Sequence, residues 1–161
     1  MSIAASRVLV TPNAVDPAFT PGPGSGSGAP PAPYALAVGA VQPRKDQGAA
    51  LEAARTAGLR LVVVGPVKDE QVAARLRAGG AEVAGYVETA RLVELYRGAA
   101  CLVQASRYEG FGLPVIEAMA CGTPVVAVDE PALVEVAGEA AVIVEAARLS
   151  EGIARALAER A

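Results

Sequence analysis

From Tyr34 onward, short apolar segments alternate regularly with longer segments of helical character, and this alternation restricts the fold more than any other feature of the sequence. The apolar segments are rich in Val, Leu and Ala, as expected for strands buried on both faces of a parallel sheet. Parallel strands joined through helices form right-handed crossovers. The sequence therefore predicts an α/β fold with a Rossmann-like parallel sheet of about six strands.

The predicted strands cover residues 34–41, 59–65, 81–85, 99–105, 124–128 and 141–144. The predicted helices lie near residues 46–57, 69–79, 89–97, 114–121, 131–137 and 149–160. Residues 7–11 read as a further short strand followed by a turn, so that 1–19 belongs to the same domain as 34–161. Residues 20–33 are almost purely Pro, Gly, Ser and Ala, a composition that predicts a flexible loop.

Composition narrows the class of protein. A chain of 161 residues is normally one domain and buries roughly two thirds of its unfolded surface. Its net charge of −3, with Lys and Arg dispersed, argues against a nucleic-acid partner. We find no signal peptide and no apolar run near the ~20 residues of a transmembrane segment.

Two cysteines and the absence of histidine limit the chemistry. Cys101 lies in an apolar strand and Cys121 near the end of a helix, without CxxC spacing, so we expect buried free thiols and a reducing, cytoplasmic setting. A chain with no histidine has neither a histidine metal site nor a histidine general base. Acids, Lys, Arg and backbone groups must therefore carry any chemistry.

A glycine turn flanked by two acids is the strongest candidate site. Glu109 precedes Gly110–Gly112, and Glu117 follows in what we expect to be the first turn of a helix with Pro114 at its first position. Such a helix start binds anions, and the two carboxylates can accept hydrogen bonds from sugar hydroxyls. The combination indicates a nucleotide sugar. Alternatively, Glu117 only complements the helix dipole and Glu109 is a solvated loop acid.

In the predicted sheet, ligands lie at the carboxyl ends of the strands, and the glycine turn at 110–112 and the loops after Ala40 and Gly65 should all lie on that edge. Arg44 and Lys45 follow the first strand and suit a diphosphate, although such a pair can equally be a solvated loop. Gly85, Tyr86 and Val87 end another strand, where Tyr86 either covers the core or borders a nucleobase.

The segment EGFGLPVIEAMACGTPVV resembles the signature of retaining, nucleotide-sugar-dependent glycosyltransferases of family four (group 1), including two Glu separated by seven residues. Near the start of the chain, SRVLVTPNAVDPAF is similar to the segment that opens the second domain of these two-domain GT-B enzymes. LAVGAVQPRKD resembles their diphosphate-binding loop in mannosyltransferase-like members, and GYVETARLVELYRGAACLVQASRYEGFG matches the approach to the signature. The resemblance covers about residues 6–145.

This resemblance implies a donor-binding domain, one half of a GT-B fold, and assigns roles to the matching residues. Glu109 would contact the donor sugar near the reacting centre, Glu117 would hold the ribose, and Arg44 and Lys45 would neutralise the departing diphosphate. The remaining positions would line the donor pocket: the backbone of Gly110, Phe111, Gly112 and Leu113 beside sugar and phosphate, and Gly85, Tyr86 and Val87 beside the base. No metal or other cofactor is implied, because the cations stabilise the diphosphate.

The sequence departs from the family pattern at three points. Ala40 stands where many members carry Arg, and Ala14 where many carry Gly. A complete enzyme also needs an amino-terminal acceptor domain, which this chain does not contain. We therefore expect the chain to bind a nucleotide sugar but to transfer hexose, for example mannose, poorly by itself, with any membrane-peripheral location arising through the missing domain.

Two alternatives remain for the function. A nucleotide-sugar epimerase of the same architecture would use a histidine, which this chain lacks. The other alternative is a non-catalytic module for nucleotide-sugar binding or assembly, although a pure scaffold would not need all four of Glu109, Glu117, Arg44 and Lys45.

Overall fold

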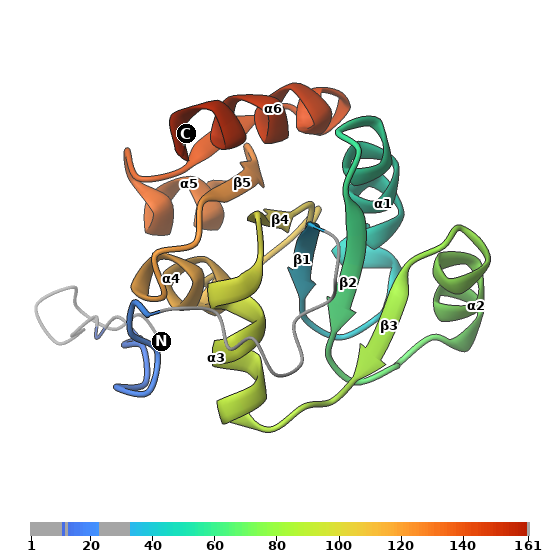
Figure 1. Cartoon of the computed structure of the whole chain (residues 1–161), viewed down its shortest axis with the longest axis horizontal. Coiled ribbons are helices and arrows are strands. Elements are labelled where there is room, and N and C mark those ends of the chain that lie inside the picture. Colours follow the sequence, from blue (N-terminus) through green and yellow to red (C-terminus); the bar gives the residue numbers. More distant parts are fainter. Residues whose placement is uncertain (1–10, 12, 23–32, 161) are drawn as a thin grey trace, which may run out of the picture.

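The computed structural model describes residues 11, 13–22 and 33–160, and it confirms the predicted α/β fold (Figure 1). The strands are β1 (Tyr34–Val38), β2 (Arg60–Val64), β3 (Glu82–Gly85), β4 (Cys101–Gln104), β5 (Val125–Val128) and β6 (Val142–Val144). The helices are α1 (Gln47–Thr56), α2 (Glu70–Ala78), α3 (Thr89–Gly98), α4 (Leu113–Ala120), α5 (Pro131–Ala137) and α6 (Leu149–Arg160). Two short 3-10 turns, η2 (Pro43–Lys45) and η3 (Ala146–Arg148), precede α1 and α6.

All six strands form one parallel sheet in the order β3-β2-β1-β4-β5-β6. Helices α1, α2 and α6 cover one face, while α3, α4 and α5 cover the other (Figure 1). The chain runs outward from β1 to β3 and then returns to place β4 on the other side of β1. The strand order therefore reverses between β1 and β4, where open α/β sheets hold their ligands at the carboxyl ends of the strands.

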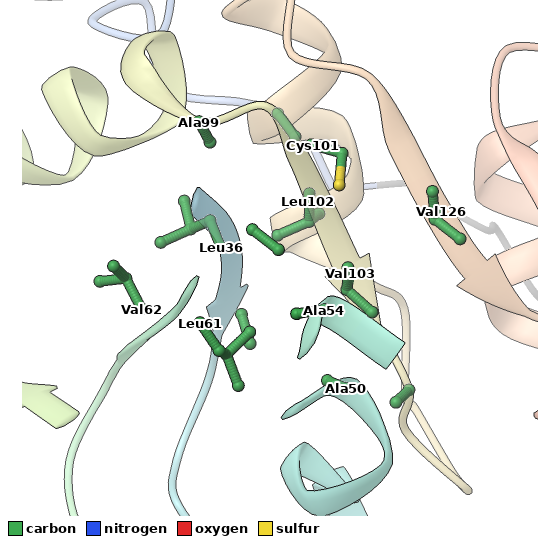
Figure 2. Packing of buried hydrophobic residues seen from close by; sticks show 14 of the residues in the cluster. Leu36, Ala50, Ala54, Leu61, Val62, Ala99, Cys101, Leu102, Val103 and Val126 are labelled. Atoms are coloured by element: carbon green, nitrogen blue, oxygen red, sulfur yellow. The ribbon is translucent and has the colours of Figure 1, made fainter. Parts of the chain in front are cut away.

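The core consists of small and branched apolar side chains from the sheet and the inner faces of the helices. Figure 2 shows the part where Ala50 and Ala54 of α1 approach the strands that carry Leu61 and Val103. The alanines allow α1 to lie close to the sheet, because their side chains add little thickness. This packing fixes the starting point of α1, and with it the loop that follows β1.

The first strand ends earlier than predicted. The expected strand 34–41 stops at Val38, because Gly39 takes a φ of +140° and turns the chain away from the sheet. Val41 pairs again with Val67 through an isolated parallel bridge. The predicted loop around Arg44 and Lys45 is instead the 3-10 turn η2. The remaining elements differ from the prediction mainly at their ends.

The amino-terminal segment 13–22 packs on α3. Phe19 is buried, and its ring meets the ring of Tyr96 edge to face with centroids 5.8 Å apart. Arg97 donates hydrogen bonds to the backbone oxygen and the hydroxyl of Thr20, both at 2.8 Å. Of the predicted strand 7–11 and loop 20–33, all but residues 11, 20–22 and 33 lie outside the described residues.

Candidate functional site

The loops after β1 and β4 are joined directly at the point where the strand order reverses. The backbone N–H of Arg107 donates to the carbonyl of Arg44 at 2.9 Å. The Arg44 guanidinium donates in return to the carbonyl of Tyr108 at 2.9 Å. Arg107 Nε also pairs with Asp46 Oδ2 at 2.8 Å. These contacts place the predicted cationic loop against the predicted acidic loop.

Glu109 lies at the centre of this junction with only 8% of its surface exposed. The Lys45 ammonium donates to its Oε1, and the amide of Gln104 donates to the same oxygen at 2.6 Å. Arg44 Nη1 lies 3.5 Å from Oε2. The three residues predicted to share a site, Arg44, Lys45 and Glu109, are therefore in direct contact. Glu109 is not the solvated loop acid of the alternative interpretation.

The pKa of Glu109 reflects these contacts. Burial by itself raises the pKa of the carboxyl group, but hydrogen bonds from Lys45, Ser106 and Gln104 and the charge of Lys45 lower it further than burial raises it. The net pKa lies below its ordinary value. Glu109 is consequently an ionised hydrogen-bond acceptor at neutral pH and not a proton donor.

Gly39 makes room for Lys45. A Cβ atom at this glycine would lie 3.1 Å from Cε and 3.2 Å from Nζ of Lys45, and the φ of +140° is one that residues with a side chain rarely adopt. The Lys45 side chain therefore lies flat against the end of β1, with 10% of it exposed. Asp46 follows with a left-handed φ of +46°, which redirects the chain into α1.

The glycine turn before α4 has distinct requirements at its two glycines. Gly112 is buried with a φ of +96°, and a Cβ there would lie 2.9 Å from the Leu133 side chain. Gly110 is exposed and has open space around it. Phe111 is half-buried and Leu113 is 41% exposed. The turn thus keeps backbone and one apolar side chain accessible beside Glu109.

Glu117 lies in the second turn of α4, and the prediction that it lies in the first turn is wrong. The helix begins at Leu113, directly after the left-handed Gly112, so Pro114 is its second residue. The half-buried Glu117 carboxylate accepts a hydrogen bond from the Tyr96 hydroxyl at 2.7 Å. Burial raises the pKa of Glu117, and the hydrogen bond from Tyr96 offsets part of that rise. A role limited to the helix dipole does not fit this position, because the dipole effect is confined to the first turn.

The loop after β3 lies on the same sheet edge, since the N–H of Gly65 at the end of β2 donates to the carbonyl of Gly85 at 2.8 Å. Tyr86 is 72% exposed and does not cover the core, whereas Val87 packs partly against it. Within the described residues, no hydrogen bond or ion pair connects this loop or Glu117 to the contacts around Glu109. The candidate site therefore consists of the ionic junction around Glu109 and two separate neighbours. One is the loop after β3, and the other is Glu117 on α4.

Gln104 and Tyr96 were not among the predicted site residues. Gln104 is 3% exposed and ends an otherwise apolar strand. A polar amide at the end of a buried strand could have identified it as a site residue from the sequence. Tyr96 is fully buried in α3, and its hydroxyl partner is 21 residues away in the chain. Nothing local in the sequence distinguishes such a tyrosine from an ordinary core residue.

The described residues contain no group of three or more His, Cys, Asp or Glu side chains able to hold a metal ion. Cys101 and Cys121 are buried and form no disulfide, as predicted. None of the described helices combines the length and apolar character that crossing a membrane requires.

Sequence comparison relates the chain to sugar-transferring enzymes. The family model "Glycosyl transferases group 1" matches residues 27–161. O-antigen chain mannosyltransferase B of Escherichia coli is 36% identical over 124 residues, which cover 70% of this chain and 32% of that protein. D-inositol 3-phosphate glycosyltransferase of Actinosynnema mirum is 37% identical over 147 residues, covering 76% and 35% respectively. The chain thus spans about a third of the length of these relatives.

Structural comparison also relates the chain to glycosyltransferases. AviGT4, a glycosyltransferase involved in avilamycin A biosynthesis, matches with a TM-score of 0.72 and 27% identity, over 92% of this chain and 47% of that one. WaaG, a glycosyltransferase involved in lipopolysaccharide biosynthesis, shares the fold with a TM-score of 0.75 at 19% identity, over 96% and 48%. The architecture matches one Rossmann-like half of these GT-B enzymes, and with the family match over residues 27–161 it establishes that this chain belongs to the group 1 glycosyltransferases.

Proposed function

We propose that the chain is the donor-binding domain of a glycosyltransferase that moves a sugar from a nucleotide-diphosphate sugar to an acceptor with retention of configuration. The observation that carries the proposal is the junction of Arg44, Lys45 and Glu109 where the strand order reverses. Two cations and a buried acid meet there in a chain that belongs to this family.

Arg44 and Lys45 would stabilise the leaving group. As the glycosyl bond breaks, positive charge develops on the anomeric carbon and negative charge on the diphosphate. The two cations stabilise the developing negative charge most effectively because they are already held in place and Lys45 is largely shielded from water. They also supply the positive charge for which other sites use a metal ion.

Glu109 would accept a hydrogen bond from the donor sugar. Gln104 and Lys45 both donate to Oε1 of its carboxylate and fix its orientation, so a hydroxyl of the donor sugar would meet an acceptor already in place. The accessible backbone of Gly110 to Leu113 would line the same pocket. Glu117 would accept a hydrogen bond from the ribose, and the exposed ring of Tyr86 would lie against the base.

The similar proteins suggest the donor class. Their names include a mannosyltransferase, a mannosylfructose-phosphate synthase and D-inositol 3-phosphate glycosyltransferases. We propose a hexosyl donor accordingly. An acceptor domain elsewhere in the complete enzyme would bind the second substrate, since this chain covers 47% of the AviGT4 chain.

The first experiment tests the diphosphate contact. UDP, GDP, uridine and guanosine are titrated by calorimetry into the chain and into the double variant R44A/K45A. The variant should bind the diphosphates at least tenfold more weakly, because charge-assisted hydrogen bonds are lost, and the nucleosides with little change. R55A/K68A removes the same charges from exposed positions and serves as the control. Equal weakening of nucleosides and diphosphates would contradict the proposal.

The second experiment tests whether this chain binds the donor by itself but needs an acceptor domain for efficient transfer. The chain alone should bind the donor yet transfer sugar far more slowly than an enzyme that contains both domains. Transfer by the isolated chain at the rate of the two-domain enzyme would disprove this view. Donor binding without transfer in the two-domain protein would favour the non-catalytic module.

A further inference from the structure

The Tyr96 side chain connects two helices at the edge of the proposed donor site. Tyr96 lies on α3 and is completely buried. Its hydroxyl donates to Oε2 of Glu117 on α4 at 2.7 Å. The other oxygen, Oε1, forms no hydrogen bond within the described part of the chain. One carboxylate oxygen of Glu117 therefore accepts a hydrogen bond from the protein, and the other can accept one from a ligand.

Several contacts hold Tyr96 in place. Thr123 Oγ1 donates to the Tyr96 carbonyl at 2.7 Å, which ties α3 to the turn after α4. The Phe19 ring meets the tyrosine ring at an interplanar angle of 72°. Arg97, the next residue, holds the neighbouring Thr20. The hydroxyl consequently has a fixed position, which a flexible surface donor would not have.

The direction of this hydrogen bond is also fixed. Burial raises the pKa of Tyr96 well above its ordinary value, and the charge of Glu117 raises it further. The phenol therefore keeps its proton and remains the donor. Its hydrogen bond lowers a Glu117 pKa that burial otherwise raises, so it favours the ionised, accepting form of the carboxylate.

We infer that Tyr96 is a positioning residue for the proposed nucleotide site: its hydroxyl holds Oε2 of Glu117, so that Oε1 is directed to a ribose hydroxyl. This inference rests on the proposed function, in which Glu117 contacts the ribose. Tyr96 acts only through Glu117 and needs no contact with the nucleotide.

The experiment compares ribose recognition among variants. UDP and GDP, each with its 2′-deoxy and 3′-deoxy counterpart, are titrated into the native chain, Y96F and E117Q by calorimetry. The native chain should prefer the ribonucleotide, and Y96F should lose roughly tenfold of that preference, as expected when a hydrogen bond to a charged group is removed. E117Q should lose the preference as well.

Y34F is the matched control. Tyr34 is also buried, and its hydroxyl donates to the carbonyl of Leu95 at 2.7 Å, on the same helix as Tyr96 but without contacting Glu117. Both variants delete one buried tyrosine hydroxyl, so both should lower the melting temperature. Only Y96F should change the preference between ribose and deoxyribose.

The outcomes separate the inference from the proposed function. If E117Q loses the preference and Y96F keeps it, Tyr96 does not position Glu117 and the inference is wrong. If the native chain has no preference or E117Q retains it, the proposed ribose contact is wrong and the inference fails with it. If Y34F loses the preference for ribose as fully as Y96F does, the loss follows from general destabilisation of the fold. That result would likewise overturn the inference.

A measurement on the native chain covers the case in which Y96F does not fold. The chain is labelled with 13Cζ-tyrosine, and the Tyr96 signal is assigned by its change in E117Q. UDP or GDP should shift this signal more than that of Tyr34, and the 2′,3′-dideoxynucleotide should shift it less. A Tyr96 signal unaffected by the bound ribonucleotide would overturn the inference.

Discussion

The ammonium of Lys45 and the amide of Gln104 donate to the same oxygen, Oε1 of Glu109, although Lys45 is 64 residues away from Glu109 in the chain. Glu109 is thus the internal counter-ion of the cation proposed to bind the diphosphate. A phosphate oxygen that approaches Lys45 competes with Glu109 for its protons and is also repelled by the carboxylate. The same acid that would orient the sugar should therefore weaken the binding of bare diphosphates.

The first prediction concerns this competition. E109Q should bind pyrophosphate and UDP or GDP roughly three- to tenfold more tightly than the native chain, because removal of one nearby negative charge is worth on the order of 1 kcal/mol in a partly shielded site. Calorimetric titration measures the change. E82Q is the control, since it removes one negative charge from a glutamate that pairs with Arg60 at 3.5 Å at the opposite end of the strands. Weaker or unchanged binding by E109Q would contradict the competition.

The second prediction concerns acid stability, where the two glutamates act in opposite directions. The pKa of Glu109 is lowered by folding, so its contribution to stability is present above its unfolded pKa of about 4.3 and is lost as the pH falls through the folded pKa. The pKa of Glu117 is raised by folding, so stability falls as the pH rises from about 4.3 through its folded pKa.

Relative to the native chain, E109Q should therefore lose less unfolding free energy between pH 7 and pH 3, and E117Q should lose more. Urea denaturation at a series of pH values gives both slopes. E52Q, at an exposed position on α1, should parallel the native curve. Identical slopes for E109Q and the native chain would show that folding does not lower the pKa of Glu109.

The third prediction concerns the close approach of β1 and β2 at their carboxyl ends. Gly65 has a φ of +143°, and a Cβ there would lie 2.3 Å from the carbonyl oxygen of Gly39. G65A should destabilise the fold by about 3 kcal/mol, because backbone cannot move aside as a side chain can. G48A, at a helical glycine with no atom within 4 Å of the added Cβ, should stabilise by roughly 0.5 kcal/mol. A G65A variant as stable as G48A would show that the strand ends are more loosely packed than described.

The fourth prediction concerns the amino-terminal segment. F19A should cost about 3 kcal/mol of unfolding free energy, since it removes a buried ring and its edge-to-face contact with Tyr96. V134A, at a residue that is 43% exposed, should change stability by less than about 0.5 kcal/mol. Equal effects in urea denaturation would mean that segment 13–22 contributes nothing to the domain.

The sequence by itself determined the class of fold and the loops that form the site. Apolar periodicity is a local property, so the six strands and six α-helices of the described residues could be predicted. Contiguous motifs carried the family resemblance, and the match over residues 27–161 confirmed the family. The carboxyl ends of parallel strands share one edge, so the sequence predicts that Arg44, Lys45 and Glu109 lie near one another. Their catalytic and binding roles stay predictions.

Only the tertiary structure decided which atoms of these residues meet. The partner of Lys45 depends on the order of β1 and β4 in the sheet, and the partner of Glu117 depends on how α3 packs against α4. Gly112 starts α4 one residue earlier than predicted and moves Glu117 into its second turn. Hydrogen bonds between residues distant in the chain are specified by packing, which places atoms to within fractions of an ångström, whereas sequence periodicity specifies only which face of an element is buried.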